Sequence, residues 1–167
     1  MADRRAIDAH PLLGALVAHQ VDFVVIGGVA LVLHGSARVT QDLDICFESG
    51  PENLAALGTA LVSLNATLAG VDDDVPFVPD AGTLRTDEVL TLDTPSGRLD
   101  VLARPSGAPA YRVLRDEADR FDLGGFAIRV ASIDHLIAMK CAAGRDKDLV
   151  DVSELEMIKR LRRRTTG

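Results

Sequence analysis

The chain has 167 residues, with 18 Lys plus Arg against 25 Asp plus Glu, which gives a formal net charge of −7 and a mean hydropathy of +0.16. A chain of this length can bury enough apolar surface to fold as one soluble globular domain, so neither a disulfide framework built on Cys46 and Cys141 nor a structural metal is needed. The acidic excess argues against non-specific coating of nucleic acid. No apolar run is long enough to span a membrane and the N-terminus lacks a signal-peptide pattern, so we expect a cytoplasmic protein.

Hydrophobic periodicity and turn residues, taken in chain order, predict a mixture of helices and strands. The expected elements are a helix over 3–19 that Asp3 caps and Pro11 interrupts or restarts, a strand over 21–26, a short buried helix over 29–33 that ends at Gly35, a strand over 40–48, a helix over 51–64, an irregular segment over 70–87, a hairpin of strands over 88–94 and 97–103, a helix over 111–121, a strand over 126–131, a helix over 132–143 capped by Ser132, and a last helix over 146–164. This order predicts an α+β fold, in which a mixed sheet and its helices form a single domain over residues 1–167.

The positive charge gathers at the end of the chain. Five of the 18 cations are Lys159, Arg160, Arg162, Arg163 and Arg164. On an ordinary solvated face, these cations would interact favourably with the negative C-terminal end of the helix dipole. Alternatively, they would bind a polyanion.

Two acids alternate with apolar residues in the strand over 40–48. Asp42 and Asp44 lie about 6 to 7 Å apart on one face, while Leu43 and Ile45 face the other way. Water offsets such repulsion if the face is solvated, and a divalent cation offsets it better, because Mg²⁺ prefers oxygen ligands of this kind. Asp100 interrupts the apolar strand over 97–103 and is the best third acid. Asp93 competes less well because Asp is common beside a turn.

A glycine pair ends the first strand and opens the helix after it. Gly27 and Gly28 would let the backbone approach phosphates, with helix N–H groups pointing at them. The alternative is a tight turn without a ligand. Neither a G-x-G-x-x-G fingerprint nor a Walker motif is present.

Three cations are candidate nucleotide ligands. Lys140 falls on the apolar stripe of the helix over 132–143, so either its stem reaches solvent or its charge meets an anion. Arg145 follows Gly144 in a loop, where it would reach phosphate or water. Arg38 lies at the mouth of the expected site, where it would make either a nucleotide contact or an ordinary surface salt bridge. His34 and Cys46 are expected to pack rather than react, Cys46 because neighbouring carboxylates would raise its pKa.

These motifs together resemble the signature of the DNA polymerase β-like nucleotidyltransferase superfamily. The resemblance rests on Ile26-Gly27-Gly28, a spacer of thirteen residues, Asp42-Leu43-Asp44-Ile45 and the third-acid strand Leu99-Asp100-Val101. The segments over 27–44 and 136–148 are similar to the bacterial abortive-infection toxins of the AbiEii type. The resemblance covers a core of about 21–155. One departure is Gly28, which replaces a serine found in many members.

The resemblance implies transfer of a nucleoside monophosphate from an NTP to an acceptor hydroxyl. Two Mg²⁺ ions, or Mn²⁺ in their place, would be held by Asp42, Asp44 and Asp100. The residues around the nucleotide would be Gly27, Gly28, Arg38, Lys140 and Arg145. RNA, above all tRNA ends, is the favoured acceptor, with protein and small molecules as alternatives, and a cognate antitoxin is an expected partner. The competing interpretation is a non-catalytic or antitoxin-like binding module with a vestigial nucleotide site.

Overall fold

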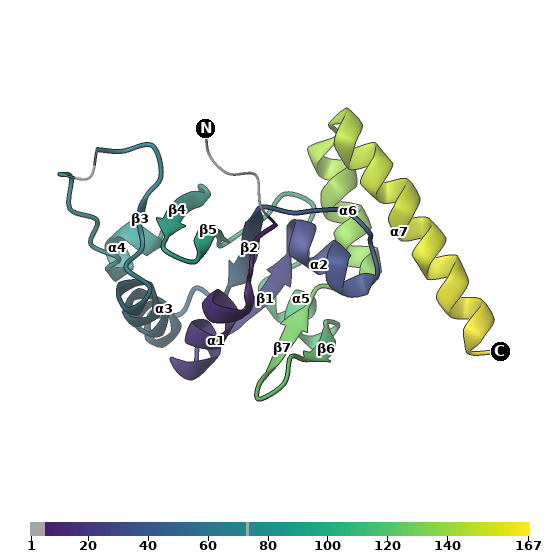
Figure 1. The fold of residues 1–167 in the computed structure, drawn as a ribbon, viewed down its shortest axis with the longest axis horizontal. Coiled ribbons are helices and arrows are strands. Elements are labelled where there is room, and N and C mark those ends of the chain that lie inside the picture. Colours follow the sequence, from purple (N-terminus) through teal and green to yellow (C-terminus); the bar gives the residue numbers. More distant parts are fainter. Residues whose placement is uncertain (1–5, 73) are drawn as a thin grey trace.

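The computed structural model describes residues 6–72 and 74–167, which form one mixed seven-stranded sheet with helices around it (Figure 1). The strands lie in the order β3 (Thr67–Leu68), β4 (Leu90–Thr94), β5 (Gly97–Leu102), β2 (Asp42–Phe47), β1 (Phe23–Ile26), β7 (Ala127–Val130) and β6 (Asp119–Asp122). The pairs β2–β5 and β1–β7 are parallel and the other pairs are antiparallel. The expected α+β fold is confirmed.

The core is built on the central strands. All four residues of β1 are buried, and Leu43, Ile45 and Phe47 of β2 are almost fully so. Leucines of α1 (His10–Ala18) and α3 (Pro51–Ser63) join them, and the two helices contact each other. The alternation along β2 therefore gives one apolar face to the core and leaves the face of Asp42 and Asp44 for other partners.

Helix α2 (Gly27–His34) follows β1 without a loop. It begins at Gly27, two residues before the expected start, and Gly35 ends it in a left-handed conformation with φ of 116°. A strand that turns directly into a helix brings the first N–H groups of the helix to the end of the sheet.

Other segments also differ from their predictions. The helix over 3–19 begins only at His10, because Pro11 occupies the first turn, where it costs no hydrogen bond; the expected Asp3 cap lies outside the described residues. The irregular segment over 70–87 contains a short helix, α4 (Ala81–Leu84), which Asp80 caps. The short strand β3 was not predicted.

The prediction of a helix over 111–121 is wrong in its second half. Helix α5 (Tyr111–Asp116) stops early, and β6 pairs with β7 through a hairpin that contains Gly124 and Gly125, both with positive φ. The pairing with β7 decides the conformation of this charged stretch, and a local pattern does not show it.

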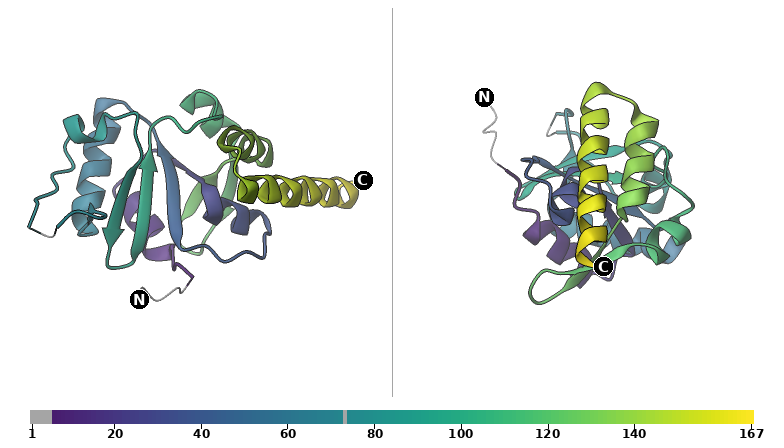
Figure 2. Two further views of the ribbon diagram at one scale, coloured as in Figure 1. Left: turned by 90° about the horizontal axis from the view of Figure 1, so that it is seen from above. Right: turned by 90° about the vertical axis from the view of Figure 1, so that its right-hand side faces the viewer.

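The chain ends in two helices, α6 (Ile133–Ala143) and α7 (Asp146–Thr165), packed together as a pair. The Ser132 side chain accepts a hydrogen bond from the N–H of His135, as expected for a cap, and Gly144 separates the helices. Figure 2 shows α7 extending beyond the rest of the molecule. None of the described helices is long and apolar enough to cross a membrane.

Candidate active site

Asp42, Asp44 and Asp100 lie on neighbouring parallel strands. Asp44 of β2 is in register with Asp100 of β5, and on its other side it is in register with Ile26 of β1. Residues in register on adjacent strands point to the same face, so Asp100 shares the face of Asp44 and, two residues along the strand, of Asp42. The structure therefore places the three acids on one face of two neighbouring strands.

The electrostatics of this group show that its charge is not compensated. Burial, followed by repulsion from Asp100, raises the pKa of Asp44 to about 7, and the same two causes raise the pKa of Asp42. The Oδ1 atom of Asp100 is buried and has no hydrogen-bond partner among the described residues. A buried acceptor without a partner is costly, so this face is arranged for a cation or donor from outside the chain.

The glycine turn lies against these acids. Gly27 has φ of +68°, and a Cβ there would lie 2.3 Å from Oδ2 of Asp44. A Cβ at Gly28 would lie 2.5 Å from Oγ1 of Thr40, whose hydroxyl donates a 3.3 Å hydrogen bond to the carbonyl of Asp42. No described side chain caps the N-terminus of α2. The turn therefore needs glycine for its close approach to the acids and leaves the helix N–H groups facing the site.

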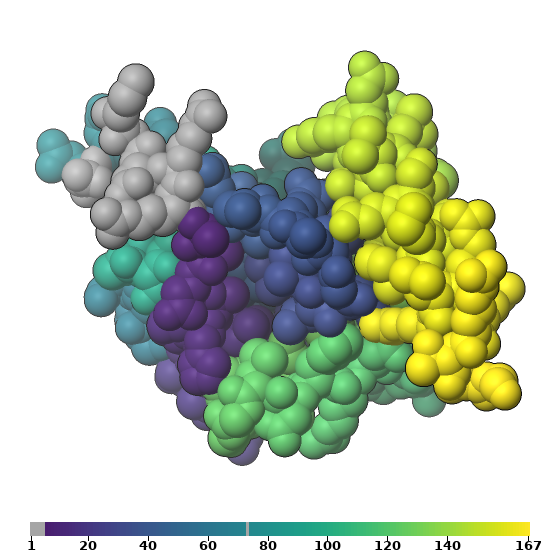
Figure 3. All heavy atoms as spheres, turned by 45° about the vertical axis from the view of Figure 1, so that its right-hand side comes forward, coloured from purple at the N-terminus to yellow at the C-terminus, as the bar shows by residue number. Residues whose placement is uncertain are grey.

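A cavity of about 420 Å³ joins these elements to α6 and α7. Figure 3 shows the surface hollowed between α2 and the pair α6–α7. Its lining includes every residue that the sequence singled out for the site: Gly27, Gly28, Arg38, Asp42, Asp44, Asp100, Lys140 and Arg145.

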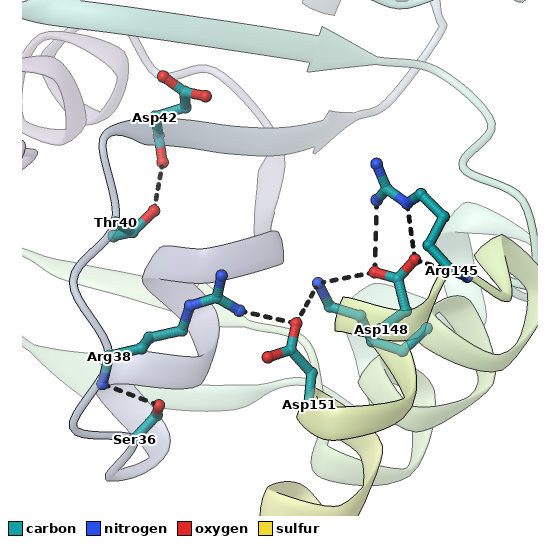
Figure 4. Close-up of polar contacts among 8 residues, drawn as sticks. Ser36, Arg38, Thr40, Asp42, Arg145, Asp148 and Asp151 are labelled. Carbon is teal, nitrogen blue, oxygen red and sulfur yellow. Dashed lines mark hydrogen bonds and ion pairs between the residues drawn. The ribbon is translucent and has the colours of Figure 1, made fainter.

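Three of the four cations that line this cavity are held by two aspartates of α7. The Arg38 guanidinium lies 2.7 Å from Oδ2 of Asp151, and Nζ of Lys140 lies 2.9 Å from the same atom. Nζ of Lys140 is also 3.5 Å from Asp148, which accepts a 2.7 Å hydrogen bond from Nε of Arg145. Figure 4 shows this chain of contacts, which we call the ion-pair network. Lys140 thus pairs with two carboxylates of the protein itself, which neither of its two interpretations had named.

Asp148 and Asp151 are the site residues that sequence reasoning missed. Both are buried, and the hydrogen bond from Arg145 lowers the pKa of Asp148 to about 2. Their spacing is the one signal in the sequence: positions 148, 151 and 155 share one helix face. The burial of this face, with Leu155 fully buried, comes from the packing of α7 and is seen only in the structure.

The residues expected to be inactive lie in packed or exposed positions. Nε2 of the buried His34 lies 2.8 Å from the carbonyl of Ala131, and burial is the main cause that lowers its pKa. Burial also raises the pKa of the Cys46 thiol to about 12, whereas the sequence argument had assigned that effect to the neighbouring carboxylates. The half-exposed Asp93 pairs with Arg98 at 3.1 Å, away from the cavity lining.

The donor set of the acidic face fits a hard divalent cation. Three carboxylates offer only oxygen atoms, one of them buried without a partner, and Asp44 resists ionisation in their company. Within 6–72 and 74–167, no three acidic, histidine or cysteine side chains already converge on a common point.

Comparisons with known proteins agree with this architecture. The family described as nucleotidyl transferase AbiEii toxin, type IV TA system, matches residues 12–160. The lincosamide antibiotic adenylyltransferase LnuA in its lincomycin-bound structure is 16% identical, with a TM-score of 0.62 over 92% of this chain and 99% of that chain. ANT(2″)-Ia in complex with adenylyl-2″-tobramycin is 14% identical, with a TM-score of 0.54 over 95% and 96%. At these identities the likeness shows the fold. The search of curated proteins found no match.

Proposed function

Because the chain belongs to the AbiEii nucleotidyltransferase toxin family, we propose that it transfers a nucleoside monophosphate from an NTP to an acceptor hydroxyl. One observation carries the proposal: Asp42, Asp44 and Asp100 face one cavity, with a glycine turn beside them and an ion-pair network across from them. Acids alone would suit many metal sites. The cations on the other wall add a reason for a polyanionic substrate.

The reaction follows from this placement. The acceptor oxygen attacks the α-phosphorus of the NTP, the bond from that phosphorus to the bridging oxygen breaks, and pyrophosphate leaves with the electron pair. Asp100 would orient the attacking hydroxyl and accept its proton. When bound by Asp42, Asp44 and Asp100, Mg²⁺ or Mn²⁺ would supply positive charge at the attacking and leaving oxygens.

The triphosphate would lie between the glycine turn and the ion-pair network. Backbone N–H groups at Gly27 and Gly28 would donate to phosphate oxygens. The network holds three cations, Arg38, Lys140 and Arg145, against two carboxylates, so it keeps one positive charge in excess. Its pairing also fixes the cations in place before the substrate arrives, which lowers the entropic cost of binding.

RNA is the proposed acceptor. The exposed cations Arg160, Arg163 and Arg164 of α7 form a basic end on an acidic protein, and the family is one of toxins. Such a surface would hold a phosphate backbone while a terminal hydroxyl enters the cavity. A cognate antitoxin would be the partner that restrains this activity in the cell.

The test is a transfer assay with each NTP labelled on the α-phosphate, Mg²⁺, and total cellular RNA or protein. We expect label in RNA with the unaltered chain and a loss of about a thousandfold or more in Asp42→Asn and Asp44→Asn. Asp122→Asn is the matched control, because this exposed strand acid lies on β6, outside the cavity lining, and should leave transfer unchanged. Full activity in the Asp42→Asn/Asp44→Asn double variant would refute the assignment.

The acceptor is tested separately. Replacing Arg160, Arg163 and Arg164 by Gln should weaken RNA binding and flatten its salt dependence, because fewer counterions are released. An unchanged salt slope, or label that enters only protein or a small molecule, would remove RNA as the acceptor and leave the transfer reaction standing.

A further inference from the structure

A second cavity, with a volume of about 680 Å³, lies between the end of α2, the start of α6 and the last turns of α7. Figure 1 shows α7 leaning away from α2 towards its C-terminal end, and the cavity lies in this opening. The candidate active site is lined by the first residues of the same two helices, α2 and α7. The two cavities therefore follow one another along this pair of helices, and we call the path that joins them the α2–α7 groove.

Both helices extend from one cavity to the other. Helix α2 lines the candidate site with Gly27 and the second cavity with His34, and Arg38, four residues further along the chain, lines the candidate site again. On α7, Asp148 lines the candidate site and Ile158, ten residues later, lines the second cavity. Ten residues of helix span about 15 Å. A ligand that fills both cavities is therefore a chain molecule, and about four stacked nucleotides cover this distance.

The second cavity combines aliphatic surface with positive charge. Its large apolar side chains are Ile133, Ile158 and Leu161, and its charged side chains are all cations: Lys159, Arg162 and Arg163. Lys159 is paired with Asp134, and no carboxylate of the described residues belongs to the lining. A ligand that suits this lining has an apolar part and a negative charge close together.

The charge of the two arginines is not neutralised by the protein. The Nη2 atom of Arg162 lies 3.1 Å from Nδ1 of His34 and 3.4 Å from the backbone carbonyl of the same residue. Nε2 of His34 lies 2.8 Å from the carbonyl of Ala131, so Nε2 carries the ring proton and Nδ1 accepts the hydrogen bond from Arg162. Among the described residues, neither Arg162 nor Arg163 pairs with a carboxylate. A guanidinium fixed by uncharged acceptors keeps its full charge for an anion from outside the chain.

We propose that the acceptor RNA runs along the α2–α7 groove, with its terminal hydroxyl in the candidate site and a nucleotide about four positions away in the second cavity. This inference rests on the proposed function, because it assigns a second contact to the RNA acceptor of that reaction. The base of the bound nucleotide would pack against Ile158 and Leu161, and its phosphate would meet Arg162 and Arg163.

The position of the second cavity favours RNA over an acidic protein segment. The acceptor must place a hydroxyl beside Asp100, and a strand that continues from there has Arg38 as a partner in the first cavity and Arg162 and Arg163 in the second. Every nucleotide of RNA carries a phosphate and a flat base, so the strand repeats the combination that the second cavity requires. An acidic protein segment would account for the second cavity alone.

The first experiment measures the binding of fluorescent single-stranded RNA to the full chain by anisotropy, without NTP, and compares a dinucleotide with an octanucleotide. Only the octanucleotide is long enough to reach the second cavity. Leu161→Ser should weaken octanucleotide binding about tenfold and leave dinucleotide binding unchanged. Leu149→Ser is the matched control, because Leu149 is 53% exposed on the same helix and Leu161 is 55% exposed, and only Leu161 lines the cavity. Equal losses in the two variants would overturn the proposal.

Charge is tested on the same helix. Arg163→Gln and Arg160→Gln remove one exposed cation each, and only Arg163 lines the second cavity. Arg163→Gln should weaken octanucleotide binding about tenfold, whereas Arg160→Gln should weaken it about twofold through the general positive field. If the two variants lose affinity equally, the arginines act as a diffuse basic surface and the cavity is not the binding site.

An acidic peptide distinguishes the two kinds of chain molecule. A peptide of eight glutamates should compete poorly with the octanucleotide, because it offers charge without bases, and Leu161→Ser should not change its affinity. A glutamate peptide that competes as well as RNA, with the same loss in Leu161→Ser, would assign the second cavity to an acidic protein segment and overturn the proposal.

The transfer assay separates this inference from the proposed function. With an NTP labelled on the α-phosphate and Mg²⁺, we expect Leu161→Ser to raise the KM of the octanucleotide several-fold and to leave the kinetics of the dinucleotide unchanged. Transfer to both RNAs without this difference would remove the second contact and leave the proposed function standing. Length-dependent binding that Leu161→Ser abolishes, without transfer to either RNA, would remove the function and leave the groove as an RNA-binding site.

Discussion

On β2 and β5, Asp44 and Asp100 lie in register without an ion pair to any described residue, and the pKa of Asp44 rises to about 7. On α7, across the same cavity, Asp148 is even more completely buried from solvent, yet Arg145 and Lys140 surround it and its pKa falls to about 2. The chain therefore neutralises the acids on the α7 side of the cavity, which we call the helical wall. It leaves the acids on the side of β2 and β5, the strand wall, unneutralised.

The difference separates two tasks that a nucleotide site must perform. The helical wall is complete without a ligand, and its two aspartates hold three cations in fixed positions. The strand wall is incomplete, because its acids repel each other until a cation arrives. Removing an acid from the strand wall and removing one from the helical wall should therefore change the free energy of unfolding in opposite directions. The following predictions rest on that contrast.

The largest effect on stability is expected from Lys140→Met. Lys140 is the only side chain that contacts both Asp148 and Asp151 among the described residues, and it is 16% exposed. Removing it leaves two buried carboxylates with one partner each, which should lower the free energy of unfolding by about 3 kcal/mol. Urea unfolding measures this change.

Lys159→Met is the control for that experiment. Lys159 pairs with Asp134, whose side chain is 68% exposed, so its loss should cost about 0.5 kcal/mol or less. Equal losses in the two variants would show that Lys140 acts as a surface cation and that the ion-pair network contributes no special stability.

The second prediction applies Asp→Asn to both walls. Asp44 has a folded-state pKa above its ordinary value of 3.8, so ionisation costs stability as the pH rises from about 4 to about 7, and the full penalty remains above that range. In EDTA at pH 8, Asp44→Asn should raise the free energy of unfolding by on the order of 2 kcal/mol.

Asp148→Asn should do the opposite. The pKa of Asp148 is depressed, so its stabilisation is present above about pH 4 and disappears as the pH falls through about 2. At pH 8 the substitution should cost about 1 to 3 kcal/mol, because Arg145 and Lys140 lose a charged partner. Melting temperatures recorded from pH 3 to 8 test whether Asp44→Asn stabilises and Asp148→Asn destabilises the protein. If both substitutions change stability in the same direction, the two walls do not differ in the way proposed.

The third prediction compares the two glycines of the turn. Gly27→Ala combines a positive φ with a Cβ 2.3 Å from Oδ2 of Asp44, so we expect a loss of about 2 kcal/mol and a displaced acid. Gly28→Ala meets only the Thr40 side chain, with Oγ1 at 2.5 Å and Cβ at 3.0 Å, so Gly28→Ala/Thr40→Ala should restore most of the melting temperature. No recovery in that double variant would place the strain in the backbone instead.

The strand wall could be predicted from sequence because its geometry is local. Alternation along β2 puts Asp42 and Asp44 on one face. Asp100 is recognisable as a third acid because it interrupts an apolar strand. What the sequence could not supply is the register of β2 against β5, which makes Asp44 and Asp100 direct neighbours. The competing Asp93 lies one strand further on, where it pairs with Arg98.

The helical wall could not be predicted in the same way. Asp148 and Asp151 belong to a charged helix, where acids are usually solvated, and only the packing of α7 against α6 buries them. The same limit explains β6, whose strand conformation comes from β7 and not from its own residues. Local patterns identified the unpaired acids, whereas the paired ones depend on contacts between distant segments.

The smallest effect is expected from Arg38→Gln. Arg38 contacts Asp151 at 2.7 Å, but its side chain is 33% exposed and Lys140 contacts the same carboxylate oxygen, so Asp151 keeps a partner and the cost should be about 0.5 kcal/mol. Its loss removes the excess positive charge of the network, so the KM for the NTP should rise several-fold while kcat changes little. Arg38→Lys, which keeps the charge, should retain most of the affinity. A fall in kcat with an unchanged KM would place Arg38 in the chemical step rather than in substrate binding.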